Sequence, residues 1–364
     1  MLLTEHNLFY YLLDKGMTDV SPVLNGEFTV RRSDSRNNNF IINREYNHHS
    51  YFIKQVKALD AEKIETMQVE ATAYRMAHTD QQYKALKVFL PDFHYYDNSN
   101  HILITGQVKD AISVYDYYIQ QQQHSNDLPV MIADILASFH KTINPSGDQQ
   151  AFRHFRRQLP WVFTIAGPAA ASLNAPAQTA DQQLMQMIAK NQALLQQITP
   201  LAALWNPVSL VHNDAKLNNF LAGYDHATGK IKFIKLIDWE LADIGDPLWD
   251  LATVMQNYLS LWLTTDLPDQ QQASYFNKIS LEQIQPWIQQ LWIRYVQQLK
   301  WTTAQIQPAL LKTIRYCALK LIHTCFETTA QMPTLQPVTV KMLQVALNIL
   351  RSPEEAAVKL FGIK

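Results

Sequence analysis

The chain has 364 residues, 47% of them hydrophobic, which suits two or three domain-sized units or one enzyme with two lobes. Its 31 Lys and Arg nearly balance 32 Asp and Glu, so a net charge of −1 gives no electrostatic attraction to nucleic acid or an anionic membrane. Two cysteines and no apolar run of membrane-spanning length argue against a disulfide scaffold or a membrane protein, and we expect two buried thiols in a soluble, cytoplasmic protein.

The first hundred residues have the pattern of a small sheet accompanied by helices. β-type runs such as FTVRR, NNFIIN and SYFIKQ alternate with polar stretches, and apolar residues at helical spacing precede and follow them. In chain order we expect a helix at 4–15 with Thr4 as N-cap, three strands between Glu27 and Gln55, a helix at 61–77, and strands around 87–95 and at 101–105.

A short link at 106–109 leads into a mostly helical remainder that contains one β-type island. The stretch SLVHNDAKLNNFLAGY (209–224) gives strands at Ser209–Val211 and Asn219–Tyr224, and Lys232–Ile237 gives a third that runs into IDWELADIGDP. Asp214 then lies on a loop between strands, and Asn219 and Asp238 lie at the two ends of a hairpin-like unit.

This arrangement suits phosphoryl transfer. An amide oxygen from Asn219 and a carboxylate from Asp238 could hold a divalent cation, with phosphate oxygens and waters as further ligands. Asp214 in front of the metal could accept the proton of an attacking hydroxyl. The phosphates also need a cation on the sheet, which Lys54 supplies at the end of SYFIKQ. Glu70 on the following helix is the preferred ion-pair partner of Lys54, and Glu65 is its rival.

Three motifs carry a family resemblance. HNDAKLNNF is similar to an H-x-D-x-x-x-x-N catalytic loop, KLIDWELADIGDPLWDLA to an I-D-[FW]-E-x-A-x-x-G-D-P-x-x-D-L-A segment, and IADILASFHKT to an L-A-x-L-H helix. On these motifs the chain resembles the aminoglycoside phosphotransferase and choline/ethanolamine kinase superfamily over roughly residues 25–255. Asn213, after the His, is more typical of the choline and ethanolamine kinases than of the drug-modifying enzymes, which usually have Gly.

The resemblance implies an α+β, protein-kinase-like two-lobed fold. The N-lobe, a small β-sheet plus one main helix, is expected at 1–105, the hinge at 106–109, and the larger, mostly helical C-lobe at 110–364. It implies an ATP- and Mg²⁺-dependent phosphotransferase that acts on an alcohol group.

The same resemblance assigns roles to single residues. Asp214 is the base, and Asn219 and Asp238 are the magnesium ligands. Lys216 stands where protein kinases place a lysine near the γ-phosphate and the acceptor hydroxyl, whereas many small-molecule relatives have His or another residue; a functional role is preferred, and the alternative is a solvated charge. Lys54 contacts the α- and β-phosphates and Glu70 positions it. His212 braces the loop, and Asp246 and Asp250 cap the following helix and tie the loop down.

The phosphate-covering loop departs from the family pattern, because RRSDSRNNNF (31–40) contains no glycine. Asn and Asp tolerate positive φ better than most residues, so the loop could still wrap phosphate. Ser35 and Asn37 in this loop, and Gln107 in the link, are the further nucleotide contacts that we predict. The bland alternative is a solvated hairpin tip.

The sequence allows several classes of molecule as the acceptor of the phosphoryl group. A polycationic aminoglycoside calls for an acidic cleft, but the segment from Leu251 to the C-terminus has ten Lys and Arg and only six acidic residues, which disfavours such a substrate. The acidic residues are Asp266, Asp269, Glu282, Glu327, Glu354 and Glu355. A small amino alcohol or sugar is preferred. The alternatives are a Ser/Thr kinase for a precursor peptide in lanthipeptide-like biosynthesis, which would need a partner enzyme, and a nucleotide-binding pseudokinase.

Six aromatic residues of the C-lobe could form a cage for a quaternary ammonium. Their helical spacing is more typical of core packing, which is the preferred interpretation. They are Trp249, Tyr258, Trp262, Trp287, Trp292 and Tyr295.

Overall fold

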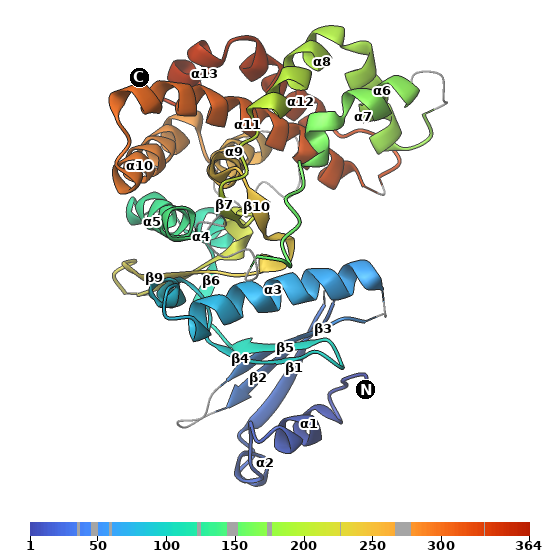
Figure 1. The fold of residues 1–364 in the computed structure, drawn as a ribbon, viewed down its shortest axis with the longest axis vertical. Coiled ribbons are helices and arrows are strands. Elements are labelled where there is room, and N and C mark those ends of the chain that lie inside the picture. Colours follow the sequence, from blue (N-terminus) through green and yellow to red (C-terminus); the bar gives the residue numbers. More distant parts are fainter. Residues whose placement is uncertain are drawn as a thin grey trace. The chain divides into compact units, whose positions relative to one another are not determined.

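The computed structural model describes residues 1–34, 37–44, 50–57, 60–121, 125–143, 152–172, 177–225, 227–265, 278–330 and 332–364. The chain forms two compact units, Met1–Ala111 with Phe233–Ala242, and Ile112–Lys232 with Asp243–Lys364. The first is built around an antiparallel sheet and the second is mainly helical (Figure 1), so the predicted α+β fold class is confirmed. The predicted hinge at 106–109 stays a prediction.

The first unit carries a five-stranded sheet with the order β1-β2-β3-β5-β4. Its pairs β1–β2, β2–β3, β3–β5 and β4–β5 are all antiparallel. The elements are α1 (Leu8–Asp14), α2 (Ser21–Leu24), β1 (Phe28–Asp34), β2 (Asn38–Arg44), β3 (Tyr51–Gln55), α3 (Ala61–Thr79), η1 (Lys84–Phe89), β4 (Phe93–Asp97), β5 (Ile102–Gly106) and, from the later segment, η5 (Trp239–Leu241).

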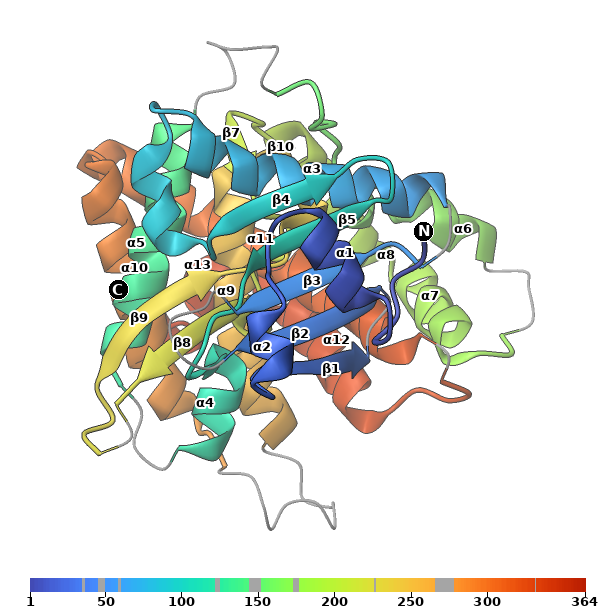
Figure 2. The same cartoon turned by 90° about the horizontal axis from the view of Figure 1, so that it is seen from below.

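The two faces of this sheet have different partners. Phe40, Ile53 and Ile104 are cross-strand neighbours on one face, where they pack with Leu8 and Leu12 of α1. Alternation along a strand turns Lys54 to the other face, which α3 covers (Figures 1 and 2). The sheet therefore presents a buried lysine to a helix.

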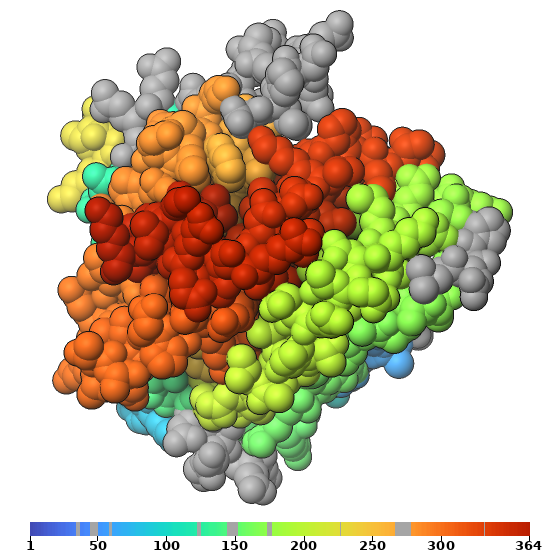
Figure 3. Space-filling model, turned by 90° about the horizontal axis from the view of Figure 1, so that it is seen from above, coloured from blue at the N-terminus to red at the C-terminus, as the bar shows by residue number. Residues whose placement is uncertain are grey.

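Helices make up most of the second unit. Helix α11 packs against α9, α12 and α13, and α10 packs against α5 and α9. Figure 3 shows one face of this unit, on which α10, α12 and α13 lie beside α7 and α8. The helices are α4 (Val114–Gln120), α5 (Asp127–Thr142), η2 (Trp161–Thr164), α6 (Ala166–Ser172), α7 (Ala180–Lys190), α8 (Gln192–Ile198), η3 (Thr199–Leu204), η4 (Leu217–Asn219), α9 (Pro247–Thr265), α10 (Leu281–Leu299), α11 (Thr303–Thr329), α12 (Pro337–Arg351) and α13 (Pro353–Lys359).

The predicted β-type island is present as short strands. β7 (Ser209–Val211) pairs with β10 (Asp243–Gly245), and a three-stranded sheet has the order β6-β8-β9. Its strands are β6 (Ala111–Ser113), β8 (Phe220–Tyr224) and β9 (Ile231–Leu236). Each predicted strand of the island matches an observed one to within a residue.

Two predicted elements were wrong in part. The first helix begins at Leu8, with Asn7 in the N-cap position, and so starts later than predicted. Thr4 still caps the turn before it, because its Oγ1 accepts from the Asn7 N–H at 3.2 Å and its own N–H donates to Asn7 Oδ1 at 2.7 Å. The strand expected around 87–95 starts later than predicted. The first residues of that run belong to a 3₁₀ helix, Lys84–Phe89, and the strand begins only at Phe93, after Pro91.

One further expectation from the sequence is confirmed. Cys317 and Cys325 are free and buried, as predicted. Among the described helices, none combines the length and the apolar character that a bilayer crossing requires.

Candidate functional site

The first unit holds Lys54 in an ion pair with Glu70. Lys54 Nζ lies 2.8 Å from Glu70 Oε2, and the two side chains are 7% and 5% exposed. The lysine comes from β3, a central strand of the sheet, and the glutamate from α3. The predicted ion pair is therefore confirmed, with Glu70 rather than Glu65 as the partner.

Two more carboxylates reach the same ammonium group. Asp238 Oδ1 lies 2.7 Å and Glu240 Oε2 2.8 Å from Lys54 Nζ. Glu240 belongs to η5, which packs against α3, and Asp238 immediately precedes it with φ 66°. A non-glycine residue in this left-handed region stores conformational strain, which is common at functional sites.

This cluster carries more negative than positive charge. Burial alone would lower the pKa of Lys54, but the carboxylates of Glu70, Asp238 and Glu240 outweigh it and raise the pKa well above its usual value. Burial, together with the charges of Asp238 and Glu240, raises the pKa of Glu70 to about 7. The cluster thus places three carboxyl groups around one ammonium, an arrangement to which a further cation can bind.

The donor set fits a hard divalent cation. One oxygen each of Glu70, Asp238 and Glu240 lies within 4.8 Å of the others. Asp238 and Glu240 keep 35% and 26% of their side-chain surface exposed, so they remain accessible to an ion. Carboxylate oxygens are the ligands that Mg²⁺ prefers, usually one or two per ion.

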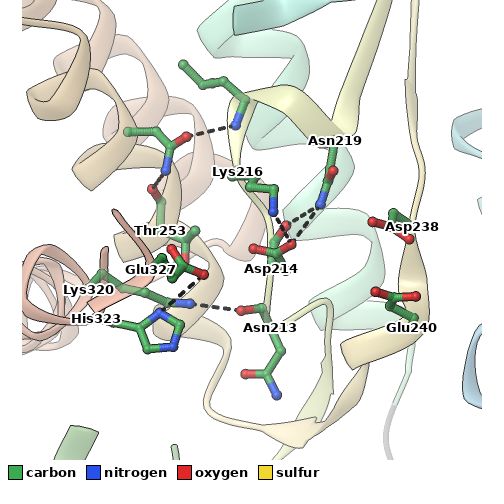
Figure 4. A network of polar contacts seen from close by, with 12 residues as sticks. Asn213, Asp214, Lys216, Asn219, Asp238, Glu240, Thr253, Lys320, His323 and Glu327 are labelled. Carbon is green, nitrogen blue, oxygen red and sulfur yellow. Dashed lines mark hydrogen bonds and ion pairs between the residues drawn. The ribbon is translucent and has the colours of Figure 1, made fainter. Parts of the chain in front are cut away.

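The second unit brings together Asp214, Lys216 and Asn219 on the loop after β7 (Figure 4). Asn219 Nδ2 donates to the Asp214 carbonyl at 2.8 Å and to Asp214 Oδ2 at 3.1 Å. Lys216 Nζ lies 2.7 Å from the same carboxylate oxygen. The amide group of Asn219 is thereby oriented, and its oxygen accepts no hydrogen bond from the residues that the structure describes.

Asp250 holds the start of this loop from α9. Its Oδ2 accepts from the His212 backbone N–H at 2.7 Å and its Oδ1 from the Asn213 N–H at 2.8 Å. His140 Nε2 lies 3.2 Å from Oδ2. Burial alone would raise the pKa of Asp250, but the hydrogen bond and charge of His140 and the contacts with His212 lower it. These bonds confirm that Asp250 ties the loop down.

Asp246 caps α9, as predicted. Its Oδ1 accepts from the Leu248 N–H at 3.1 Å, and its Oδ2 from the Asn206 N–H at 3.0 Å. Gly245, before it, is required by close packing, because a Cβ there would lie 2.6 Å from Val211 Cγ2 on the paired strand β7. The G-D-P segment thus joins a tight strand pair to a capped helix.

The remaining predicted nucleotide contacts are dispersed along the first unit. Asn37 is half-buried between β1 and β2, and Ser35 lies outside the described residues. The Gln107 N–H donates to the Ser50 carbonyl at 2.9 Å. The side-chain Oε1 of Gln107 is buried and has no hydrogen-bond partner within the described part of the chain. Their contacts with a nucleotide stay predictions.

Five of the six aromatic residues proposed for a cage are core residues. Each of the five is at most 4% exposed. Tyr258 and Trp287 pack on Tyr118, and Tyr295 packs on His140. Trp262 is half-buried and has Lys341 over its ring. The core-packing interpretation is therefore confirmed for Trp249, Tyr258, Trp287, Trp292 and Tyr295.

One site residue escaped the sequence prediction. The motif around Asp238 predicted no role for Glu240, although Glu240 contacts Lys54 as closely as Glu70 does. The available signal was its position in the same motif, two residues after Asp238 and within the short 3₁₀ helix η5 that follows it.

Comparison with known proteins agrees with these motifs. A family model described as phosphotransferase enzyme family matches residues 43–287. That match confirms the superfamily resemblance and the predicted enzyme class. Among the curated proteins, none matches this chain.

Solved structures give the fold. An ethanolamine kinase from Plasmodium vivax is 14% identical with a TM-score of 0.59, over 97% of this chain and 90% of that one. A choline kinase from Cryptosporidium parvum is 14% identical with a TM-score of 0.56, over 97% and 96%. An aminoglycoside 2′-phosphotransferase in complex with GDP is 12% identical with a TM-score of 0.55, over 98% and 99%. The predicted kinase-like fold is confirmed.

Proposed function

The chain belongs to the phosphotransferase enzyme family, and we propose that it transfers the γ-phosphate of ATP, with Mg²⁺, to a hydroxyl of a small molecule such as an amino alcohol or a sugar. The observation that carries the proposal is the buried Lys54, held by Glu70 and contacted by two partly exposed carboxylates. Phosphoryl transfer depends mainly on positioning and charge neutralisation, and this cluster offers both.

The nucleotide side of the reaction uses the first unit. Lys54 would contact the phosphates, with Glu70 fixing its ammonium group. Asp238, with Asn219 as the predicted second ligand, would hold Mg²⁺, and Glu240 is an additional candidate. A bound Mg²⁺ neutralises charge on the phosphate oxygens. A relative of the same fold solved with GDP supports nucleotide use.

The acceptor side uses Asp214. Its carboxylate is oriented by Asn219 and is partly exposed, so it can accept the proton of an attacking hydroxyl. Lys216, bonded to the same oxygen, would place a positive charge beside the transferred phosphoryl group. Both roles are proposals made on this geometry and on the motif.

A small hydroxyl acceptor is preferred over a peptide. The structurally similar proteins reported above are named for ethanolamine, choline and an aminoglycoside. The excess of basic over acidic residues beyond Leu251 disfavours a polycationic aminoglycoside, so amino alcohols and sugars come first. Neither a peptide substrate nor a partner enzyme gains support from these comparisons.

The test is a screen for acceptor-stimulated ADP release. Purified protein with ATP and Mg²⁺ is offered amino alcohols, sugars and Ser/Thr peptides, with Asp214→Asn as the matched control. We expect stimulation by a small hydroxyl compound and none in the control. Stimulation by peptides alone would replace the acceptor class, and nucleotide binding without ADP release under any condition would favour a pseudokinase.

A further inference from the structure

Lys320 of α11 is buried, and no carboxylate of the residues that the structure describes forms an ion pair with it. It is 4% exposed, and the carboxylates of Asp214, Asp250 and Glu327 act on its ammonium group through their charges. Burial lowers the pKa of Lys320 from its ordinary value. Because burying an unpaired ammonium costs free energy, its retention calls for a specific interaction.

Two groups contact this ammonium. Lys320 Nζ donates to the Asn213 carbonyl at 2.8 Å (Figure 4). It also lies 4.4 Å from the centroid of the Trp249 ring, within the range of a cation–π interaction. Lys320 therefore joins α11 to the residue that directly precedes the proposed base, Asp214.

Asn213 has a backbone conformation that must be held. Its φ is 67°, in the left-handed region that non-glycine residues adopt only at a cost. Its N–H is bound by Asp250 of α9 and its carbonyl by Lys320 of α11. The buried carboxylate of Asp250 and the buried ammonium of Lys320 thus bind the N–H and the carbonyl of the same residue.

We propose that Lys320 is a positioning residue for phosphoryl transfer, which acts through the Asn213 carbonyl to hold Asp214 in its productive orientation. The inference rests on the proposed function, in which Asp214 is the base. Without the bond to Lys320, the plane of the 213–214 peptide could rotate, and the direction of the Asp214 side chain would change with it. Small misplacements of reacting groups slow catalysis strongly.

The matched control is Lys312 on the same helix. Lys312 Nζ pairs with Asp246 at 2.5 Å and lies 5.5 Å from the centroid of the Tyr316 ring. It is thus also a partly buried lysine above an aromatic ring, but its partner caps α9 and does not belong to the catalytic loop. Lys312→Met should lower thermal stability with little change in kcat.

The experiment is a double-mutant cycle between Lys320→Met and Asn213→Gly. Lys320→Met should lower kcat by about 10- to 100-fold, with the nucleotide Kd within about twofold of the parent. Glycine adopts positive φ without strain, so Asn213→Gly should recover at least about threefold of the loss in kcat. A lysine that served only packing would show no such recovery.

Three results would overturn the proposal: a folded Lys320→Met with the parent's kcat, a loss that Asn213→Gly does not reduce, or an equal loss of kcat in Lys312→Met. Should Lys320→Met not fold, Lys320→Gln is measured in the same cycle. If the parent transfers phosphate to no acceptor, the proposed function fails instead, and the Lys320–Asn213 coupling is then decided by the same cycle in thermal unfolding.

Discussion

At the scale of single residues, backbone conformation explains which residue types the motifs contain. Asn213 and Asp238 have φ values of 67° and 66°, and Asn and Asp are among the few side chains that tolerate this region. Asn213 stands where drug-modifying enzymes of the superfamily usually have Gly, and either residue meets the same requirement. The positive φ at position 213 therefore explains why an Asn or a Gly follows the His of the catalytic loop.

Replacement of the proposed base tests its role directly. Asp214→Asn removes the proton acceptor with almost no change in volume, so turnover should fall by ~10²-fold or more while folding and nucleotide binding persist. Steady-state kinetics and calorimetric titration with nucleotide measure the two effects. Turnover at the parent's rate would exclude Asp214 as the base.

Removal of the proposed metal ligand should act on nucleotide binding. Asp238→Ala takes away an anionic oxygen that lies beside Lys54, so Mg²⁺-dependent nucleotide binding should weaken and transfer should cease. Calorimetric titration at several Mg²⁺ concentrations measures this effect. The control is Asp225→Ala in the turn after β8, whose carboxylate bonds, among the described residues, only within that turn and to Lys232, so Mg²⁺-dependent nucleotide binding should stay unchanged. An unchanged Mg²⁺ dependence in Asp238→Ala would contradict the ligand assignment.

At the scale of elements, α9 anchors the catalytic loop through Asp250. Asp250→Ala leaves His140 and two backbone N–H groups without their buried acceptor, so we expect a loss of about 3–5 kcal/mol in unfolding free energy. Chemical denaturation measures it. Asp127→Ala, at the exposed first turn of α5, is the control and should cost little.

The same contribution should depend on pH with a definite sign. The pKa of Asp250 is lowered in the folded protein, so its stabilisation is present above the usual Asp pKa of about 3.9 and is lost as pH falls through the lowered value. The stability difference between parent and Asp250→Ala should therefore stay constant at neutral pH and shrink only below about pH 4. A difference that shrinks near neutral pH would contradict this assignment.

The elements differ in how well the sequence predicts them. Helix α3 follows Asp60, whose side chain accepts from the Glu62 N–H, and this cap is visible in the sequence. The stretch KALKVFLPDF was predicted as part of a strand around 87–95, because a short apolar run fits a strand and a buried helical turn equally well. Its division into η1 and β4 depends on tertiary packing that no local pattern contains.

At the scale of the whole molecule, ordered motifs predicted the site better than chemistry at single positions did. The segments around Asp214 and Asp238 contained the proposed base and metal ligands in fixed spacing. Lys320 was not predictable, since a lysine in a helix is ordinarily exposed and its contact with Asn213 joins positions 107 residues apart. Long-range contacts of this kind appear only in the folded chain.

Ligand binding should stabilise the whole chain through the nucleotide cluster. ATP with Mg²⁺ at about 100 times its Kd should add about 2.7 kcal/mol to the unfolding free energy, because the ligand binds only the folded protein. Thermal unfolding should therefore shift to higher temperature with ATP and Mg²⁺, and removal of the metal with EDTA should abolish most of the shift. A shift that persists fully in EDTA would argue against a metal-dependent nucleotide site.

The central claim is transfer of the γ-phosphate to a hydroxyl with Asp214 as the base, and phosphorus NMR follows that event directly. With ATP, Mg²⁺ and the acceptor found in the screen, the γ-phosphate signal should decline as signals of ADP and of a new phosphate monoester grow. Asp214→Asn and the parent in EDTA should leave ATP unchanged. Release of inorganic phosphate alone by the parent, or ester formation by Asp214→Asn at the parent's rate, would contradict the account.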